Sequence, residues 1–490
     1  MTRLRTRPAV FTVSSLLGGY GWRRTGNGQG IRVEIGKIAI GAAAMIEAGD
    51  VEAAQAQIVD RLRERPEDPA LWAEAGYFLQ RIGNDADALG CLERAWVLGG
   101  RDIRIPYYLG IACRSLGLPI EAEAHFRQAL ALDDRYGDAW HHLGVALAHQ
   151  GRFAEAIDSF EAARARLDDD SGLGDRIWRT RFLAGDADEA WRLCEASLPG
   201  DLEARWCEMH GTGHRQWRGE ALAGQEIVLF SHGGNGDTIH YFRYLDQVLA
   251  AGPDRITLII QPALVRLALA SPIVASAGEG RIRVMTTEGA LEDRPGYFMW
   301  FEGLAMLFRA KPGAMAPWRP YLAPTPARAD FWATRLGAGE GARIGLVWRG
   351  SPGMPEDRWR SIPLDQFLPL FALPDCRWFA LQQGPLPDEE RDILARAGVT
   401  DLSAALTDFS ETAAILAQLD LVITIDSAPA HLAGALGRAT WMLNRATSEW
   451  RWGWKQSESF WYPTMRIFNQ DQLGDWAPAI AAVRAALAAR

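Results

Sequence analysis

The sequence has few lysines, no paired cysteines and no long apolar run. Only Lys37, Lys311 and Lys455 are lysines among its 52 basic residues, so any phosphate-binding site in this chain would have to use arginine or the backbone. Arginine suits that task because its guanidinium binds phosphate through two parallel hydrogen bonds. The five cysteines are scattered and form no Cys-x-x-Cys pair. This argues against a zinc site and a disulfide framework, and we expect a reducing compartment, the cytoplasm, and no bound metal.

The apolar runs of the sequence argue against a membrane-spanning segment, and its charge argues against a nucleic-acid partner. No uncharged apolar stretch reaches the roughly 18 residues that a membrane-spanning helix needs, so we expect no integral membrane segment. The formal net charge of −9 and the isoelectric point near 5.6 argue against a nucleic-acid-binding surface. Residues 1–34 end in a stretch rich in Gly, Arg and Asn. We predict that they form a disordered lead-in rather than a signal peptide.

The first part of the chain repeats with a constant step. Glycines recur at positions 49, 83, 117, 151 and 185, and alanines recur at 54, 88, 122, 156 and 190. This 34-residue period matches the tetratricopeptide repeat, in which pairs of helices stack into a solenoid. Glycine permits the tight turn between paired helices, and alanine lets helices approach closely. We therefore predict a tetratricopeptide-repeat domain over residues 35–200.

Repeat arrays of this kind present a concave face that binds extended peptides. The side chains that we expect on that face are Tyr77, Tyr107, Arg114 and His141. The alternative is that some of them only fill the space between neighbouring repeats. The first interpretation predicts a protein partner held in the groove.

From Gln225 onward, strands alternate with helices, which indicates parallel sheets. A proline-dotted stretch at 312–327 interrupts this pattern, which then restarts. We predict two doubly wound domains, residues 201–325 and 326–490, with a cleft between them. The fold class expected for the whole chain is a helical solenoid followed by two Rossmann-like α/β domains.

Two of the loops that follow strands would face this cleft. The loop at 231–237 contains Gly234 and Gly236, which permit a tight turn and close approach to a ligand. It ends in Asp237, which is either a cap of the next helix or a general base directed across the cleft. The second loop carries Arg360, at a strand end where an arginine could clamp an anion.

The third such segment is the most informative in the chain. An apolar strand, 421–425, runs into Asp426. A short turn of Ser427, Ala428 and Pro429 follows, and His431 lies on the first turn of a small-residue helix. The free N–H groups and the positive dipole end of such a helix suit a phosphate. The segment therefore predicts an anion-binding strand, turn and helix, with a hydroxyl and an imidazole added.

An aromatic run near the C-terminus admits two interpretations. It consists of Trp450, Trp452, Trp454, Trp461 and Tyr462. These rings can stack on the base or the sugar of a ligand. They can equally pack the two α/β domains together, and the sequence leaves both interpretations open.

These segments, in this order, resemble the bacterial heptosyltransferase-like glycosyltransferases of the GT-B fold. The closer resemblance is to the branch in which tetratricopeptide repeats precede the transferase. It is carried by Gly-Asp-Thr-Ile-His at 236–240, the strand and loop at 345–352, Arg-Ser-Ile-Pro at 360–363, and the segments 426–437 and 459–470. The arrangement is also similar to that of protein O-GlcNAc transferases, whose motifs match less well.

The resemblance implies an inverting, metal-independent transfer from a nucleotide sugar, with no cofactor. It implies that Asp237 is the catalytic base and that Arg360 contacts the donor phosphate, where heptosyltransferases usually have lysine. It further implies that the motif from Asp426 to His431 holds the donor diphosphate. The residues expected at the donor are Gly234, Gly236, Arg360, Asp426, Ser427, Ala428 and His431.

Two residues depart from the family pattern. Ala428 replaces the usual glycine, and Glu302 adds a charge where the branch often has a serine-containing segment. These departures favour an alternative in which the protein is an adaptor with an inactive transferase domain. In the first interpretation the repeats recruit a polypeptide acceptor, for which the resembling branch suggests bacterial flagellin. In a third, the acceptor is a lipid-linked glycan and the repeats serve assembly.

Overall fold

The computed structural model describes residues 51–167, 172–198, 200–286, 291–292, 296–314, 318–351, 353–354 and 357–489. The chain divides into two compact units, and the division falls after Thr180. Residues 51–180 are called the repeat unit and residues 181–489 the two-sheet unit. The predicted lead-in, 1–34, lies outside the described residues.

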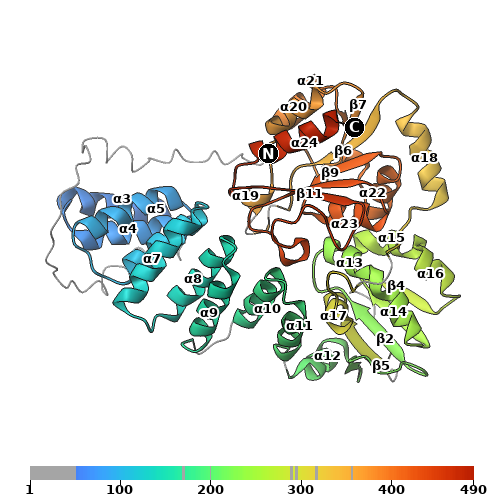
Figure 1. The fold of residues 1–490 in the computed structure, drawn as a ribbon, viewed down its shortest axis with the longest axis horizontal. Coiled ribbons are helices and arrows are strands. Elements are labelled where there is room, and N and C mark those ends of the chain that lie inside the picture. Colours follow the sequence, from blue (N-terminus) through green and yellow to red (C-terminus); the bar gives the residue numbers. More distant parts are fainter. Residues whose placement is uncertain are drawn as a thin grey trace. The chain divides into compact units, whose positions relative to one another are not determined.

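The repeat unit is built of helices joined by short turns (Figure 1). Successive helices pack in pairs, α4 (Pro69–Arg81) with α5 (Asp85–Val97), α6 (Arg104–Ser115) with α7 (Pro119–Leu132), and α8 (Gly137–His149) with α9 (Phe153–Arg164). The helix α3 (Val51–Glu64) precedes them, and α10 (Leu173–Leu183) follows and crosses the division between the units. The predicted helical solenoid is confirmed.

The repeated small residues have the two roles that the period predicts. The recurring glycine adopts a positive φ, which is 79° at Gly83 and Gly117, 75° at Gly151 and 89° at Gly185. Residues with a side chain rarely adopt this conformation, so glycine ends one helix and turns the chain toward the next. The recurring alanine is fully buried at positions 54, 88, 122, 156 and 190.

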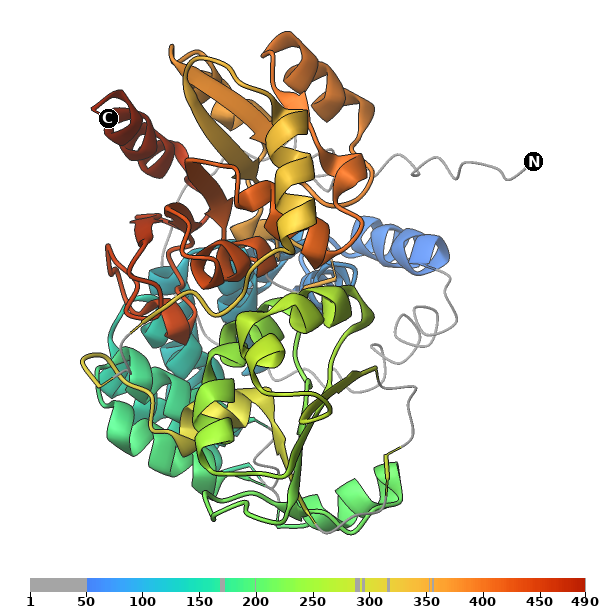
Figure 2. The same cartoon turned by 90° about the vertical axis from the view of Figure 1, so that its right-hand side faces the viewer.

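The two-sheet unit contains two parallel sheets, which lie in two lobes (Figure 2). The first lobe has the strand order β1-β5-β2-β3-β4, and the second has β11-β10-β9-β6-β7-β8. Every pair of neighbouring strands in both sheets is parallel. The prediction of two parallel, Rossmann-like sheets is therefore confirmed.

The first lobe comprises β1 (Arg215–Gln216), β2 (Glu226–Phe230), α13 (Asn235–Tyr241), η1 (Phe242–Tyr244), α14 (Leu245–Ala250), β3 (Arg255–Ile259), η2 (Pro262–Leu264), α15 (Val265–Ala270), α16 (Pro272–Ser276), β4 (Ile282–Met285), β5 (Gly296–Trp300) and α17 (Phe301–Leu307). The second lobe comprises α18 (Pro326–Leu336), β6 (Ala342–Val347), α19 (Asp357–Arg360), η3 (Leu364–Phe367), α20 (Leu368–Phe371), β7 (Cys376–Ala380), α21 (Asp388–Arg396), β8 (Thr400–Asp401), η4 (Ser403–Ala405), α22 (Phe409–Leu416), β9 (Leu421–Ile425), α23 (Ala428–Ala435), β10 (Thr440–Asn444), η5 (Trp450–Trp452), β11 (Met465–Asn469) and α24 (Ala477–Ala488).

The strand order of each sheet reverses at one place. In the second lobe the chain runs outward from β6 to β8 on one side, returns to β9 beside β6, and runs outward to β11 on the other. In the first lobe the same reversal lies between β2 and β5. Ligands of open α/β sheets bind beyond the carboxyl ends of the strands at such a reversal, because the loops there diverge and leave a crevice.

Two further helices, α11 (Ala187–Ala196) and α12 (Leu202–His210), belong to the two-sheet unit. The buried indole of Trp191 donates its Nε1 hydrogen to the carbonyl of Ala310 at 2.6 Å. Two ion pairs flank it, Lys311 with Asp188 and Arg309 with Glu195. The end of the repeated sequence is thus packed into the core of the two-sheet unit.

Two findings bear on the expectations that the sequence raised about membrane-spanning helices and disulfide bonds. None of the helices in the described part of the chain is both long enough and apolar enough to cross a bilayer. None of the five cysteines, all of which lie in the described part of the chain, forms a disulfide.

Candidate functional site

Four segments leave the two sheets at the points where the strand order reverses. In the first lobe, the segments after β2 and β5 carry Gly233 and Glu302. In the second lobe, the segments after β6 and β9 carry Arg360 and Asp426. The fold therefore gathers, at one end of each sheet, the loops that the sequence marks as chemically important.

The helices that start from these loops join the two lobes. Helix α13 of the first lobe packs directly against α23 of the second. A Cβ atom at Gly236 would lie 3.1 Å from Cδ2 of His431 and 3.3 Å from Cα of Ala428. The absence of a side chain at Gly236 lets the two helices meet at this distance. Gly236, Ala428 and His431, all expected at the donor, are thus neighbours.

Arg360 lies beside the turn that precedes α23. Its Nη1 donates to the backbone carbonyl of Asp426 at 3.2 Å, and its Nη2 donates to Oδ1 of Asp357 at 2.9 Å. Only 17% of the Arg360 side chain is exposed. These contacts hold the guanidinium at the carboxyl end of β9, where it adds a positive charge to the start of the helix.

The N-terminus of α23 is not capped by a side chain. Ser427 is the residue before the helix, but its hydroxyl donates back to the carbonyl of Ile425 at 3.2 Å and makes no cap. Pro429 occupies the first turn, where its missing N–H costs no hydrogen bond. An uncapped helix start beside Arg360 is a geometry that suits an anion.

Asp237 caps the helix that follows it, which is one of the two roles that its sequence position allows; its role as a base stays a prediction. Its Oδ2 accepts the N–H of Gly234 at 2.8 Å, which caps α13. Its Oδ1 accepts a hydrogen bond from Nη2 of Arg451 at 2.5 Å. One quarter of the side chain, 25%, is exposed. The carboxylate is therefore fixed in place and still reachable.

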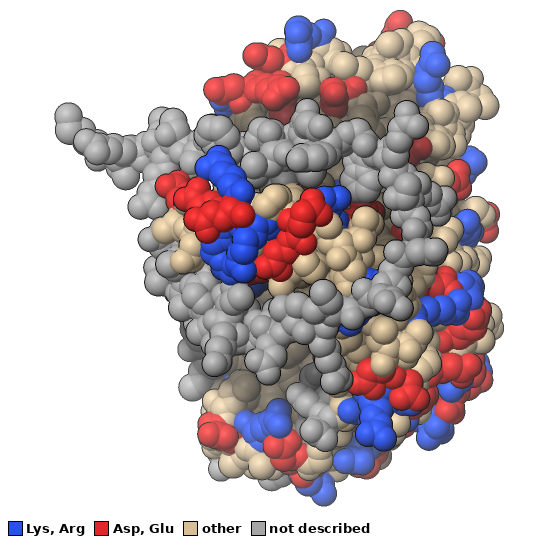
Figure 3. Space-filling model, turned by 90° about the vertical axis from the view of Figure 1, so that its left-hand side faces the viewer, with Lys and Arg blue, Asp and Glu red and all other residues tan. Residues whose placement is uncertain are grey.

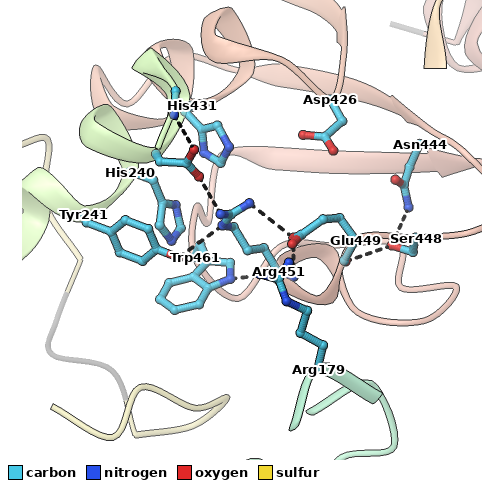
Figure 4. A network of polar contacts seen from close by, with 12 residues as sticks. Arg179, His240, Tyr241, Asp426, His431, Asn444, Ser448, Glu449, Arg451 and Trp461 are labelled. Carbon is cyan, nitrogen blue, oxygen red and sulfur yellow. Dashed lines mark hydrogen bonds and ion pairs between the residues drawn. The ribbon is translucent and has the colours of Figure 1, made fainter. Parts of the chain in front are cut away.

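Arg451 connects the two lobes, and sequence reasoning missed it. Besides Asp237 it contacts Oε2 of Glu449 at 3.3 Å and the hydroxyl of Tyr241 at 3.2 Å (Figure 4). Burial alone would lower the pKa of Arg451, but Glu449, Tyr241 and Asp237 outweigh it and hold the pKa well above its ordinary value. The sequence did contain a signal, since Arg451 lies between two tryptophans and such a segment is often buried. A buried arginine needs a carboxylate partner, so the position could have been singled out.

Family models match one segment in each half of the chain. A model described as tetratricopeptide repeat matches residues 109–171, and one described as glycosyltransferase family 9 (heptosyltransferase) matches residues 390–465. The chain combines tetratricopeptide repeats with a glycosyltransferase family 9 domain. The matched stretch contains the turn after β9, α23 and Arg451.

Relatives and solved structures cover different shares of the chain. Protein FlbA of Caulobacter vibrioides is 26% identical over 444 residues, which are 86% of this chain and 73% of FlbA. The match to a crystal structure of MamA covers 33% of this chain and 92% of the MamA chain, with 23% identity and a TM-score of 0.30. The crystal structure of YrrB, described as a TPR protein with an unusual peptide-binding site, covers 31% and 79%, with 19% identity and a TM-score of 0.29.

In the family 9 domain, His431 is buried within a polar cluster. Nδ1 of His431 and Nδ1 of His240 each lie 3.0 Å from the hydroxyl of Tyr462. Burial, with Arg243 and Arg451 nearby, lowers the pKa of both imidazoles well below the ordinary value, which favours their neutral forms. The ring of Trp452 stacks on that of His431, with their centroids 5.0 Å apart. A direct contact of His431 with a donor stays a prediction.

The aromatic run of the family 9 domain is mostly buried. Trp450, Trp452, Trp461 and Tyr462 are each less than 5% exposed. The indole of Trp461 donates to the backbone carbonyl of Arg451 at 2.8 Å. These rings pack the protein interior and hold the segment that presents Arg451, which is the second of the two roles open in the sequence.

Glu302 lies at the same end of the first lobe as Asp237. Its Oε1 accepts the N–H of Gly233 at 3.0 Å. Its Oε2 is buried and has no hydrogen-bond partner among the described residues. Burial is the main cause that raises the pKa of Glu302, and the charge of Asp237 raises it further.

The four residues expected in the repeat groove are half-buried, and three of them, Tyr77, Tyr107 and His141, lie in a chain of ring contacts. The distances between ring centroids are 4.6 Å for Tyr77 and Tyr108, 5.1 Å for Tyr108 and Tyr107, 5.7 Å for Tyr107 and His142, and 4.7 Å for His142 and His141. The charge of Arg114 acts on both Tyr107 and His141. The hydroxyl of Tyr77 and Nε2 of His141 are buried without a hydrogen-bond partner among the described residues. Sequence reasoning missed Tyr108 and His142, which continue the row.

Within the described ranges, no group of three or more His, Cys, Asp or Glu side chains is placed to hold a metal ion.

Proposed function

We propose that this protein transfers a sugar from a nucleotide-sugar donor to a hydroxyl group of a polypeptide that the repeats recruit. The transfer is inverting, uses the two lobes as a GT-B enzyme does, and needs no metal. The observation that supports the proposal is the packing of α13 on α23. It brings Gly236, the residue before Asp237, against Ala428 at the uncapped helix start, and Arg360 contacts the turn before that helix.

The donor half of the proposed site is the turn after β9. When the sugar leaves the nucleotide, negative charge develops on the diphosphate and must be stabilised by fixed positive groups. Arg360 and the first turn of α23, with Ser427 and Ala428, supply them. Asp426 positions this turn through its carbonyl, and His431 supports it from the protein interior.

The acceptor half is the loop after β2. Asp237 takes the proton of the acceptor hydroxyl, while the acceptor oxygen attacks the sugar from the face opposite the nucleotide. Gly234 and Gly236 let the backbone approach the donor closely, because neither carries a side chain. One displacement of this kind inverts the anomeric configuration.

The repeats select the acceptor. The ring row that contains Tyr77, Tyr107 and His141 offers half-buried aromatic rings on which a polypeptide can stack. Flagellin is the candidate acceptor that the family resemblance suggests. We place the reaction in the cytoplasm, where nucleotide sugars are available.

Donor binding is tested by calorimetry on the full chain with UDP, GDP, dTDP, ADP and CMP. Arg360→Ala should weaken the binding nucleotide about tenfold or more, because a charge-assisted contact to phosphate is lost. Asp237→Asn should leave that affinity unchanged and lower transfer by about 10²- to 10⁴-fold. Arg358→Ala is the matched control, since this arginine lies on the same helix and stacks on Trp359. Equal affinities for wild type and Arg360→Ala would refute the role of Arg360.

A second candidate is an adaptor with an inactive transferase domain. It is favoured by the engagement of both Asp237 oxygens, one with Arg451 and one with Gly234. Failure of all five nucleotides to bind the wild type supports the adaptor. Mass spectrometry of glycoproteins from cells with and without the gene identifies the acceptor and separates a protein from a lipid-linked one.

A further inference from the structure

A groove runs between α7 and α9 of the repeat unit, over the helix α8 that joins them (Figure 1). Its volume is about 330 Å³. Leu143 and Leu147 of α8 line it and are almost fully buried, whereas Trp140 beside them is partly exposed. Arg127 of α7 and Asp158 of α9, both exposed, stand at its rim. An apolar floor below a charged rim is the form of a pocket that takes an inserted side chain.

The groove lies on a different face of α8 from the ring row. Successive residues of an α-helix are turned by about 100° around its axis. Trp140, Leu143 and Leu147 therefore share one side of α8, while His141 and His142 project from the other. A partner held in the groove would leave the ring row open to another polypeptide, so the groove is a surface of its own.

Equivalent residues of two repeats differ at this groove. Leu130 of α7 lines it, and the equivalent residue one 34-residue period earlier is Trp96. The ring of Trp96 packs against the hydrophobic core of its own repeat. Leucine is smaller than tryptophan, so Leu130 leaves space that an indole would fill, although protein interiors are normally close-packed. The groove therefore accompanies a departure from the repeat pattern.

The rim of the groove carries an excess of negative charge. Nη1 of Arg127 lies 2.7 Å from Oε1 of Glu123, and its Nη2 lies 3.6 Å from Oε2 of Glu155. Arg152 contacts the same Glu123 at 2.7 Å. Asp158 forms no ion pair with any residue that the structure describes. Three carboxylates thus stand beside two arginines, which leaves one negative charge for a cation of a partner.

We propose that the groove binds a segment of another protein that inserts an apolar side chain against Trp140 and places a lysine or arginine beside Asp158. A basic side chain suits this place because its hydrocarbon stem can lie on apolar surface while its charged end reaches the carboxylate. The proposal does not depend on the proposed function, since the groove belongs to the repeat unit and the proposed transfer site to the two-sheet unit.

The test selects short random peptides on the immobilised full chain, after peptides that bind Leu130→Trp have been removed. This variant fills the groove with the side chain that the preceding repeat carries at the same position, and circular dichroism verifies that it is folded. The selected peptides are synthesised with a fluorescent label. Fluorescence anisotropy then gives the Kd for the wild type and for each variant.

The selected peptides should contain a lysine or arginine close to a large apolar residue. Leu130→Trp should raise the Kd at least about tenfold, because the inserted side chain loses its place. Asp158→Asn should raise it about two- to fivefold, as expected for an exposed ion pair. Asp158→Lys should prefer a peptide whose basic residue is exchanged for glutamate, whereas the wild type should prefer the original peptide.

Asp60→Lys is the matched control, since it makes the same charge change on the exposed face of α3 and should leave both preferences unchanged. Selected peptides that lack a basic residue would overturn the proposal, and so would a failure to find any peptide that distinguishes wild type from Leu130→Trp. A loss of binding in His141→Ala as large as that in Leu130→Trp would place the peptide in the ring row instead. If Leu130→Trp does not fold, peptides are selected on the wild type alone, and an unchanged preference in Asp158→Lys overturns the proposal.

Discussion

At the scale of single residues, the side chains near the proposed site serve structure and chemistry together. Asp237 caps α13 and at the same time joins the lobes through Arg451. The interpretations that the sequence offered for Asp237, helix cap or base directed across a cleft, are therefore compatible. Arg451 is decisive here because its buried guanidinium holds the Asp237 carboxylate in place across the two lobes.

Replacement of Arg451 by alanine should destabilise the two-sheet unit by about 3–5 kcal/mol, because Asp237 and Glu449 lose a shared buried partner. Urea denaturation of the full chain, followed by tryptophan fluorescence, measures the change. Arg205→Ala is the control, since its ion pair with Asp201 is exposed and should contribute less than about 1 kcal/mol. An unchanged unfolding midpoint for Arg451→Ala would show that the pair does not couple the lobes.

At the scale of elements, small residues determine how closely helices pack. A Cβ atom at Gly144 would lie 2.6 Å from the ring of Phe160, and one at Gly110 would lie 2.5 Å from the ring of Phe126. Each contact joins the first helix of a repeat to the second. The large residue of one helix fills the space that glycine leaves on the other, which explains why both recur with the period of the array.

Two glycine-to-alanine changes in the repeat unit should have opposite effects. Gly144→Ala should cost about 1–3 kcal/mol, because Phe160 must move to admit a methyl group. Gly90→Ala, in helix α5 with nothing within 4 Å of the new Cβ, should stabilise the unit by about 0.5–1 kcal/mol. Thermal unfolding followed by circular dichroism distinguishes the two, and a loss of stability in both would contradict the packing argument.

At the scale of the whole molecule, the end of the repeated sequence and the start of the two-sheet unit overlap. Helix α11 still shows the repeat pattern, with Gly185 and Ala190 in phase. It nevertheless packs within the two-sheet unit through Trp191. The predicted domain boundary at 200 follows the sequence period, whereas the compact units follow the burial of side chains.

A fragment of residues 172–490 should therefore unfold at a higher urea concentration than a fragment of residues 201–490. The shorter fragment lacks Trp191 and leaves Arg309 and Lys311 without their carboxylates. Loss of a buried tryptophan alone costs about 3–5 kcal/mol. Equal midpoints for the two fragments would show that α11 is dispensable for the two-sheet unit.

The sequence by itself determined the features that depend on local periodicity. The 34-residue step predicted the solenoid, and the alternation of strands and helices predicted two parallel sheets, because both patterns repeat over short separations along the chain. The strand, turn and helix at 421–435 could be predicted for the same reason. The loops that carry Asp237, Arg360 and Asp426 were accordingly within reach of sequence reasoning.

Only the tertiary structure decided which of these residues meet. Arg451 and Asp237 are 214 positions apart, His240 and Tyr462 are 222 apart, and Gly233 and Glu302 are 69 apart. No local pattern encodes such pairs, since they depend on the path of the chain through two sheets and on the close packing that Gly236 permits. The burial of His431 and the neighbouring carboxylates of Asp237 and Glu302 follow from that packing.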